Sequence, residues 1–236
     1  MNELFLTSLR SEMKNLISDP LKVSRFFKTE GSSYAAHDRF LGISVPNLRK
    51  IADKYLTLNP QNWIPLITSI YNEERLLSLI MMVTVFKKSD NEKKKDIYDF
   101  YREYLLFVNN WNLVDSSAPY ILGAYLFDFP NNSLLWDLVK SENLWYRRIA
   151  IVSTLFFIKK NHLQPTLELA KELFDDKEDL IRKASGWMLR EVGKKDLSTL
   201  LHFLKEHKKN MSKITYRYAC ERLSIENKIY IESDTS

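Results

Sequence analysis

Apolar residues recur at intervals of three and four along almost the whole chain, which is the spacing of one face of an α-helix. Three such stripes are Leu76, Leu79, Ile80 and Val83; Ile149, Val152, Leu155 and Phe156; and Leu180, Ala184, Trp187 and Met188. No stretch keeps the alternation of apolar and polar residues that a half-buried strand would show. The pattern therefore predicts an all-α protein.

Residues that end and cap helices divide this pattern into short segments. They gather at Asp19-Pro20, Asn59-Pro60, Ser89–Asn91, Phe129–Asn132, Gln164-Pro165, Asp175-Asp176 and Lys194–Asp196. Glycine is scarce, with five in 236 residues, as expected where short turns join helices. We expect helical hairpins that follow one another in a single repeat domain over residues 1–223. Residues 224–236 are expected to form a frayed C-terminal tail.

Composition and charge narrow the function and location. The net charge of +5 permits a polyanionic partner without requiring one. Cys220 is the only cysteine, which excludes a disulfide framework and favours a reducing, cytoplasmic location. Neither a membrane span nor a secretion signal is evident. The four histidines lack metal-ligand spacing and no P-loop is present, so we expect no metal or other cofactor. We also expect the protein to be a monomer.

An internal repeat places one acid where its equivalents are arginines. The segments Trp145–Ala150 and Asp179–Ala184 each carry a basic residue, one variable residue and an alanine at the start of an apolar helix. Backward steps of a similar interval reach two further helix starts. On this alignment one position of the repeat is filled by Arg75, Asp115, Arg148 and Arg182. Equivalent positions of stacked hairpins line one face, so Asp115 is the first candidate for chemistry.

Each of these residues also has a purely structural interpretation. Arginine at a repeat position can cap or bridge adjacent helices, which we favour for Arg75 and Arg182. Asp115 can equally be the partner of a neighbouring arginine within the scaffold, because structural ion-pair networks also contain acids. Other tryptophans in the chain are expected to pack in the core, namely Trp63, Trp136 and Trp145.

Two tryptophans favour a chemical role for Asp115. Trp111 precedes it by four residues and so shares its side of a helix, and Trp187 opens the equivalent stretch of a later repeat beside Gly186. Indole faces attract cations and sugar C–H edges at about 0.5–2 kcal/mol per contact, and a carboxylate can stabilise an oxocarbenium ion. A neutral glycoside needs a second acid for its leaving group, and none is evident. A purine alkylated at N3 or N7 is already cationic, so one acid suffices.

Four segments resemble the bacterial DNA alkylation repair glycosylases of the AlkD type. They occur in matching order between residues 1 and 223 and are Arg39–Pro46, Asn110–Ser116, Asn143–Ala150 and Ser185–Glu191. The resemblance implies a right-handed, solenoid-like stack of HEAT-like helical hairpins whose concave basic groove holds double-stranded DNA. It also implies base-excision repair of 3-methyladenine and 7-methylguanine lesions without the base flipping that other glycosylases use.

The resemblance further assigns roles to individual residues. It implies that Trp111 and Trp187 cradle the deoxyribose. Asp115 would be the catalytic acid, and Arg148 would hold the backbone beside the lesion. Ser44 stands where at least one relative has a longer amide and would contact the opposite DNA strand.

Phosphate contacts are expected to supply most of the affinity for DNA and to make it sensitive to salt. The basic candidates on or near the expected groove are Arg148, Lys183, Arg190 and Lys194. Asn112, where relatives often have aspartate, is a second departure from the family pattern.

Two other classes of function stay open from the sequence. The chain can be a catalytically inactive HEAT-repeat scaffold that binds DNA, because helical repeat arrays are often binding modules. It can also be an adaptor for proteins, which would show no salt-dependent affinity for duplex DNA. The presence of Trp111, Asp115, Arg148 and Trp187 together favours the enzyme. A scaffold that only binds DNA has no need of an acid that faces phosphates.

Overall fold

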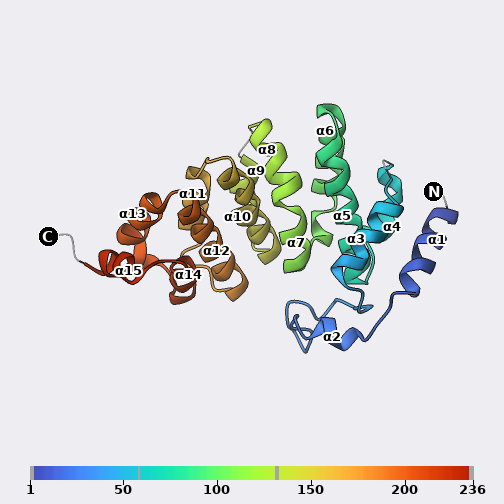
Figure 1. The fold of residues 1–236 in the computed structure, drawn as a ribbon, viewed down its shortest axis with the longest axis horizontal. Helices are drawn as coiled ribbons and strands as arrows, with labels where there is room; N and C mark the ends of the chain where they lie inside the picture. The colour runs from blue at the N-terminus through green and yellow to red at the C-terminus, as the bar shows by residue number, and fades with distance from the viewer. Residues whose placement is uncertain (1–2, 58, 131–132, 234–236) are drawn as a thin grey trace. The chain divides into compact units, whose positions relative to one another are not determined.

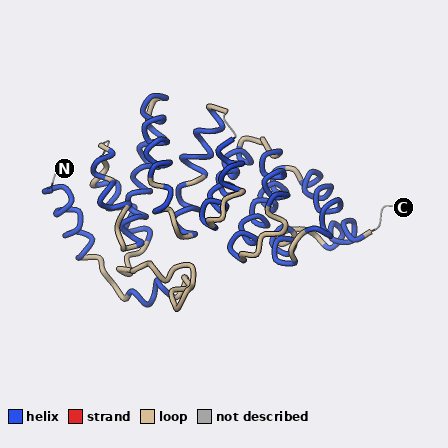
Figure 2. The backbone as a smooth tube through the Cα atoms, turned by 180° about the vertical axis from the view of Figure 1, so that it is seen from behind, coloured by secondary structure: helices blue, strands red, loops and turns tan. Residues whose placement is uncertain are grey.

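The regular structure of the protein is helical throughout the part of the chain that the computed structural model describes, residues 3–57, 59–130 and 133–233 (Figures 1 and 2). Within these ranges the sheet-like pairing is limited to an isolated parallel bridge between Arg39 and Tyr71. None of the described helices combines the length and apolar character needed to span a membrane. The all-α prediction is confirmed.

The helices fall into two compact units, Met1–Ser117 and Ala118–Ser236. The first unit contains α1 (Glu3–Lys14), α2 (Pro20–Ser24), α3 (Val45–Lys54), η1 (Pro60–Asn62), α4 (Ile64–Ile67), α5 (Asn72–Lys88), α6 (Asn91–Glu103), η2 (Leu105–Phe107) and α7 (Trp111–Ser117). The second contains η3 (Pro119–Gly123), α8 (Ala124–Asp128), α9 (Ser133–Val139), α10 (Leu144–Lys159), α11 (Gln164–Glu172), α12 (Asp179–Lys195), α13 (Leu197–His207), η4 (Lys208–Asn210), α14 (Lys213–Ala219) and α15 (Ile225–Glu232). In each unit, neighbouring helices pack as the HEAT-like hairpins that the sequence predicts.

At three of the predicted breaks an aspartate caps the helix that follows. Asp19 accepts the N–H of Leu21 ahead of α2, and Asp90 accepts that of Lys93 ahead of α6. Asp196 does the same ahead of α13, where hydrogen bonds from Ser198 and Thr199 lower its pKa to about 2. These caps satisfy N–H groups that the first turn of a helix leaves without partners.

Helix α5 is the core of the first unit. It packs against α3, α4, α6 and α7, and it is buried on nearly all sides. The predicted apolar stripe from Leu76 to Val83 is buried, and so are the polar residues of the first turn, Asn72 to Arg75. Polar groups are costly to bury unless they are hydrogen-bonded, so this turn needs partners from other segments.

Helices α10 and α12 are the centre of the second unit. They pack against each other, α10 also contacts α9, α11 and the π-helix η3, and α12 contacts α13 and α14. Gly186 on α12 permits the contact with α14, because a Cβ there would lie 2.5 Å from both the Thr215 carbonyl oxygen and the Tyr218 Cβ. Gly186 therefore serves the packing of α12 against α14.

The tryptophans assigned to the core follow that assignment in two of three cases. Trp63 and Trp145 are buried, at 0% and 6% exposure. Trp136 on α9 is partly exposed, and the Lys140 ammonium group lies 6.0 Å from its ring centroid. A lysine side chain covers this indole in place of core packing.

The chain after Ser224, which we expected to fray, forms helix α15 in the structure. Ser224 caps it by accepting the N–H of Asn227, and Ile231 is fully buried. Glu232 accepts a hydrogen bond from the Tyr216 hydroxyl at 2.8 Å. The cap, the buried Ile231 and the bond to Glu232 hold this segment in place beside α13. The polar composition of the tail did not indicate a helix.

Substitution of Gly186 by alanine is expected to destabilise the protein. Alanine normally stabilises a helix interior by about 0.5–1 kcal/mol relative to glycine, but the added Cβ would press on the Thr215 carbonyl group. We expect Gly186→Ala to lower the free energy of unfolding by roughly 1–3 kcal/mol in urea denaturation. Gly193→Ala on the same helix is the control, because the three atoms nearest to its Cβ all belong to the side chain of Leu200 and the shortest contact is with a terminal methyl that can rotate. Equal stability of Gly186→Ala and the unmodified protein would refute the tight contact.

Candidate functional site

Helix α7 carries two of the candidate residues. Trp111 is its first residue and Asp115 lies four residues later. Both are partly exposed, whereas Leu113 and Val114 between them are buried. Side chains four residues apart lie on one side of a helix, so the two candidates share the accessible side of α7.

The Trp111 indole is held by an aromatic stack. It stacks on Phe27 at a centroid distance of 5.0 Å and an interplanar angle of 21°. Phe27 stacks in turn on Phe40 at 4.7 Å and 28°. Both phenylalanines come from the irregular segment between α2 and α3, and the sequence analysis missed them because no local pattern connects them with α7. One face of the indole is thus occupied by protein.

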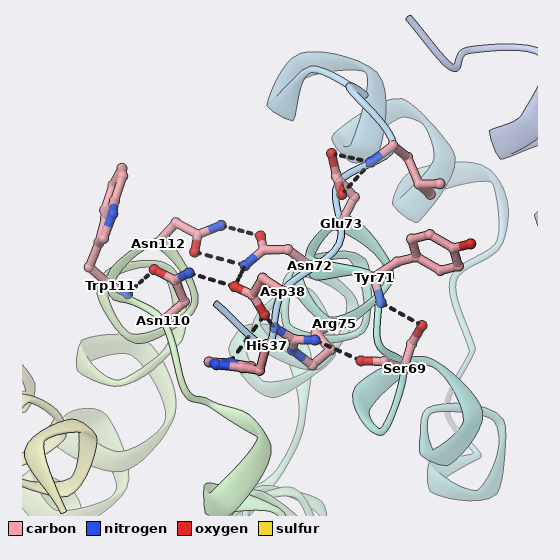
Figure 3. Close-up of polar contacts among 11 residues, drawn as sticks. His37, Asp38, Ser69, Tyr71, Asn72, Glu73, Arg75, Asn110, Trp111 and Asn112 are labelled. Atoms are coloured by element: carbon pink, nitrogen blue, oxygen red, sulfur yellow. Dashed lines mark hydrogen bonds and ion pairs between the residues drawn. The ribbon is translucent and has the colours of Figure 1, made fainter. Parts of the chain in front are cut away.

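A buried carboxylate lies at the base of α7 (Figure 3). The side chain of Asp38 has no exposed surface. Its Oδ1 pairs with the Arg75 guanidinium group and lies 3.2 Å from His37 Nε2. Its Oδ2 accepts hydrogen bonds from Asn72 Nδ2 at 2.9 Å and from Asn110 Nδ2 at 2.6 Å. Arg75 neutralises the carboxylate, as burial of a charge requires.

Two asparagines link this carboxylate to the first turn of α7. Asn110 precedes the helix, and its Oδ1 accepts the backbone N–H of Trp111 at 2.7 Å. Asn112 donates from Nδ2 to Asn72 Oδ1 at 2.7 Å (Figure 3). Asn112, the departure from the family pattern, therefore belongs to the polar network. The sequence analysis treated Arg75 as a helix bridge and did not find Asp38, Asn72 or Asn110.

Irregular segment 37–42 is fixed to the start of α5. Arg39 donates its N–H to the Ile70 carbonyl group at 3.1 Å and accepts that of Asn72 at 2.9 Å. Glu73 accepts the N–H of Leu41 at 3.0 Å and that of Gly42 at 2.9 Å. Burial raises the pKa of Glu73, and these backbone donors oppose the rise. The segment is held by hydrogen bonds although it is not a helix.

In the second unit, Trp187 and two of the basic candidates bond to acids. Trp187 Nε1 and Lys194 Nζ donate to Glu191 Oε1 at 3.1 and 2.7 Å. Arg190 pairs with Glu221, which is 51% exposed. Solvent-exposed pairs of this kind contribute about 0.2–1 kcal/mol. The Arg190–Glu221 pair therefore contributes little to the stability of the second unit.

Arg148 and Lys183 differ in their surroundings. Arg148 is 6% exposed, and its Nη1 donates to the Leu180 carbonyl group at the start of α12 at 2.6 Å. Lys183 on α12 is partly exposed. Of the two residues, Arg148 is the more deeply set and connects α10 with α12.

Helix starts correct the repeat alignment by one residue. The N-cap residues of α5, α10 and α12 are Tyr71, Asn143 and Glu178. Four residues after each of them stand Arg75, Arg147 and Arg182, so the repeated arginine of α10 is Arg147 and not Arg148. The sequence alignment followed the basic residue and alanine, whereas the caps set the true register.

The corrected register distinguishes two positions in these helices, the fourth and the fifth residue from the helix start, and we call the residues in each position a row. The fourth helical residue is an arginine that donates to the carbonyl group six residues earlier, which is Ser69 for Arg75, Ser141 for Arg147 and Asp176 for Arg182. The fifth residue is Leu76 on α5, Asp115 on α7, Arg148 on α10 and Lys183 on α12. The structural interpretation of the arginines therefore applies to the fourth position. Asp115 belongs to the other row.

Ser44 lies at the N-cap of α3, where it is exposed and its side chain makes no capping hydrogen bond. The first unit thus contains Ser44, Trp111 and Asp115, and the second contains the remaining candidates. Among the residues that the structure describes, no cluster of three or more His, Cys, Asp or Glu side chains is placed to hold a metal ion.

Comparisons with known proteins agree with this architecture. A family model for DNA alkylation repair enzymes matches residues 15–223. The solved structure of a predicted DNA alkylation repair enzyme from Enterococcus faecalis superposes with a TM-score of 0.67 and 17% sequence identity, over 87% of this chain and 95% of that one. At this identity the likeness concerns the fold. Curated protein sequences gave no match.

The two rows should respond differently to mutation. Arg147→Ala removes hydrogen bonds to the carbonyl groups of Ser141 and Glu142 and leaves the nearly buried Asp176 without this cation. We expect a loss of roughly 1–3 kcal/mol in the free energy of unfolding. Lys183→Ala, in the fifth position of α12, should stay within about 0.5 kcal/mol of the unmodified protein. Urea denaturation of both variants tests the register, and equal losses would contradict it.

Proposed function

The chain belongs to the DNA alkylation repair enzyme family, and on this premise we propose that it is a DNA glycosylase that excises N3- and N7-alkylated purines from duplex DNA. The observation that carries this function is the pair on α7, where an acid and an indole share the accessible side of one helix. Asp115 also stands in the fifth helical position, whose counterparts on α10 and α12 are the cations Arg148 and Lys183. An acid in this position is unusual for a surface that binds phosphates.

The chemistry needs a single carboxylate. The bond between C1′ of the deoxyribose and the purine nitrogen breaks, and its electron pair leaves with the cationic base, which becomes neutral. The sugar is left as an oxocarbenium ion, which Asp115 stabilises by its negative charge. Water adds to C1′ and loses a proton. A free base and an abasic site result, and no metal or redox partner is consumed.

The motif resemblance implies that the other candidates bind the DNA. Trp111 and Trp187 present indole faces to the deoxyribose, and Arg148 holds the phosphate next to the lesion. Lys183, Arg190, Lys194 and Ser44 bind the backbone at a greater distance. Positive charge on the lesion gives the selectivity, because a neutral base departs poorly without a general acid. Such a site acts on a lesion that stays within the duplex, as the motif resemblance implies.

Asp115→Asn is expected to abolish release of 7-methylguanine from a duplex that carries one such lesion. Asparagine keeps the shape of the side chain but removes the charge that stabilises the sugar cation, while DNA affinity stays close to that of the unmodified protein. Release is measured by single-turnover excision with enzyme in excess. Asp137→Asn on α9, where the aspartate is exposed, is the matched control and should be fully active.

The same assay separates the enzyme from the inactive scaffold. A scaffold would bind duplex DNA in a salt-dependent manner and release no base, even as the unmodified protein. Full activity of Asp115→Asn would also overturn the assigned role.

Basic residues of the fifth row should account for part of the salt dependence of binding. Removal of one phosphate contact reduces the slope of log affinity against log salt by about 1. We expect this change for Lys183→Ala in fluorescence-anisotropy titrations with an undamaged duplex. Lys95→Ala on α6, where the lysine pairs with Asp99, should leave the slope unchanged. Identical slopes for both variants would exclude Lys183 from the DNA contact.

A further inference from the structure

The start of α7 is fixed by two hydrogen bonds of the Asn110 side chain, and their donors and acceptors allow only one orientation of its amide group. The Trp111 backbone N–H is a donor, so the atom of Asn110 that faces it is the acceptor Oδ1. The Asp38 carboxylate only accepts, so the atom of Asn110 that faces it is the donor Nδ2. Asn110 is fully buried and therefore connects a buried anion directly to the backbone of the residue that carries the candidate indole.

A second connection runs through Asn72. Its Nδ2 donates to Asp38, which leaves Oδ1 to accept from Asn112. The residues on both sides of Trp111 are thus tied to the same carboxylate, one directly and one through Asn72 (Figure 3). The first turn of α7 can neither rotate nor shift along its axis without breaking one of these bonds.

Asp38 is itself held in place. Arg75 pairs with it and also donates to the Ser69 carbonyl group at 2.7 Å. Arg39, the residue after Asp38, forms an isolated parallel β-bridge with Tyr71. Two residues after Asp38, Phe40 begins the aromatic stack that ends on Trp111. The short segment from Asp38 to Phe40 is therefore connected to α7 by hydrogen bonds and to the indole through Phe27.

We propose that Asp38 is a positioning residue, which through Asn110 sets the direction in which Trp111 and Asp115 project from α7. This inference rests on the proposed function for its catalytic consequence. Asp38 touches neither substrate nor Asp115 in this scheme. It acts because a helix anchored at its first turn presents the residue one turn later in a fixed direction.

The test uses Asn110, because substitution of Asp38 would leave Arg75 as a buried charge without its partner. Asn110→Ala removes the link to α7 and leaves the pair of Asp38 and Arg75 intact. We expect the single-turnover rate constant for 7-methylguanine release at saturating enzyme to fall roughly 10- to 100-fold, the effect of a small misplacement of reacting groups. Partial unfolding alone would raise the total enzyme concentration needed for saturation and would not change the rate constant at saturation.

Asn110→Asp separates the network from simple helix capping. Aspartate caps helices as well as asparagine does, so a pure cap would keep the rate of the unmodified protein. In the network, the new carboxylate cannot donate to Asp38 and repels it, so the rate should fall at least as far as with alanine. Glu74→Gln is the matched control, because Glu74 is also buried at the start of α5 but pairs with Arg10 on α1. Its rate constant should be unchanged.

Hydrogen exchange gives a readout that does not depend on catalysis. In Asn110→Ala, the amides of residues 111–114 should exchange faster, while those of α10 keep their rates. If the unmodified protein releases no base, the proposed function fails, and exchange alone decides the inference. Unchanged exchange in the first turn of α7 would overturn it, as would release by a folded Asn110→Ala variant at the rate of the unmodified protein.

Discussion

A carboxylate without access to water must be neutralised by a cation and bonded on its remaining lone pairs. Asp38 imposes this condition on the first unit. Arg75 supplies the charge from α5, and Asn72 and Asn110 supply N–H donors from the starts of α5 and α7. The condition explains why Asn72 and Arg75 are buried in the first turn of the core helix. Buried ion pairs add little net stability, so the consequence of this one is geometric: three segments distant in sequence must meet.

The sequence was sufficient for features that depend on neighbours along the chain. Helical periodicity predicted α5 and the buried stripe from Leu76 to Val83, and Asp90 and Asp196 marked helix starts, because capping and helical periodicity are local effects. The Asp38 network could not be predicted in this way. Its members are separated by 34 to 72 residues, and nothing in the pattern around Asp38 or Asn110 shows that either side chain is buried.

The candidate site was predicted to a different extent in each half. Asp115 was singled out by the repeat alignment, and Trp111 by its distance of four residues from Asp115, which the helix preserves. The arginine of α10 was assigned to the repeat one residue too late, because Arg147 and Arg148 are adjacent and only the cap distinguishes them. The partners of Trp187 and Arg190 are acids on the same or a neighbouring helix. In the corrected register, the arginines in the fourth position bond to backbone carbonyl groups of the scaffold. The residues in the fifth position differ in chemistry from one repeat to the next.

The irregular chain between α2 and α3 contains one glycine with open space around it and one that is tightly packed against other backbone. At Gly31 the backbone has φ +57°, and a Cβ there would meet no atom within 4 Å. At Gly42, with φ +77°, a Cβ would lie 2.9 Å from backbone atoms of Ser18 and Asp19, and the N–H group is bonded to Glu73. Inserted sequence or new chain ends are tolerated where the backbone is exposed and makes few bonds. A tag or a circular permutation would therefore be accommodated near Gly31. A break near Gly42 would instead free segment 37–42 from α5, and with it the bond by which Asp38 holds Asn110 at the start of α7.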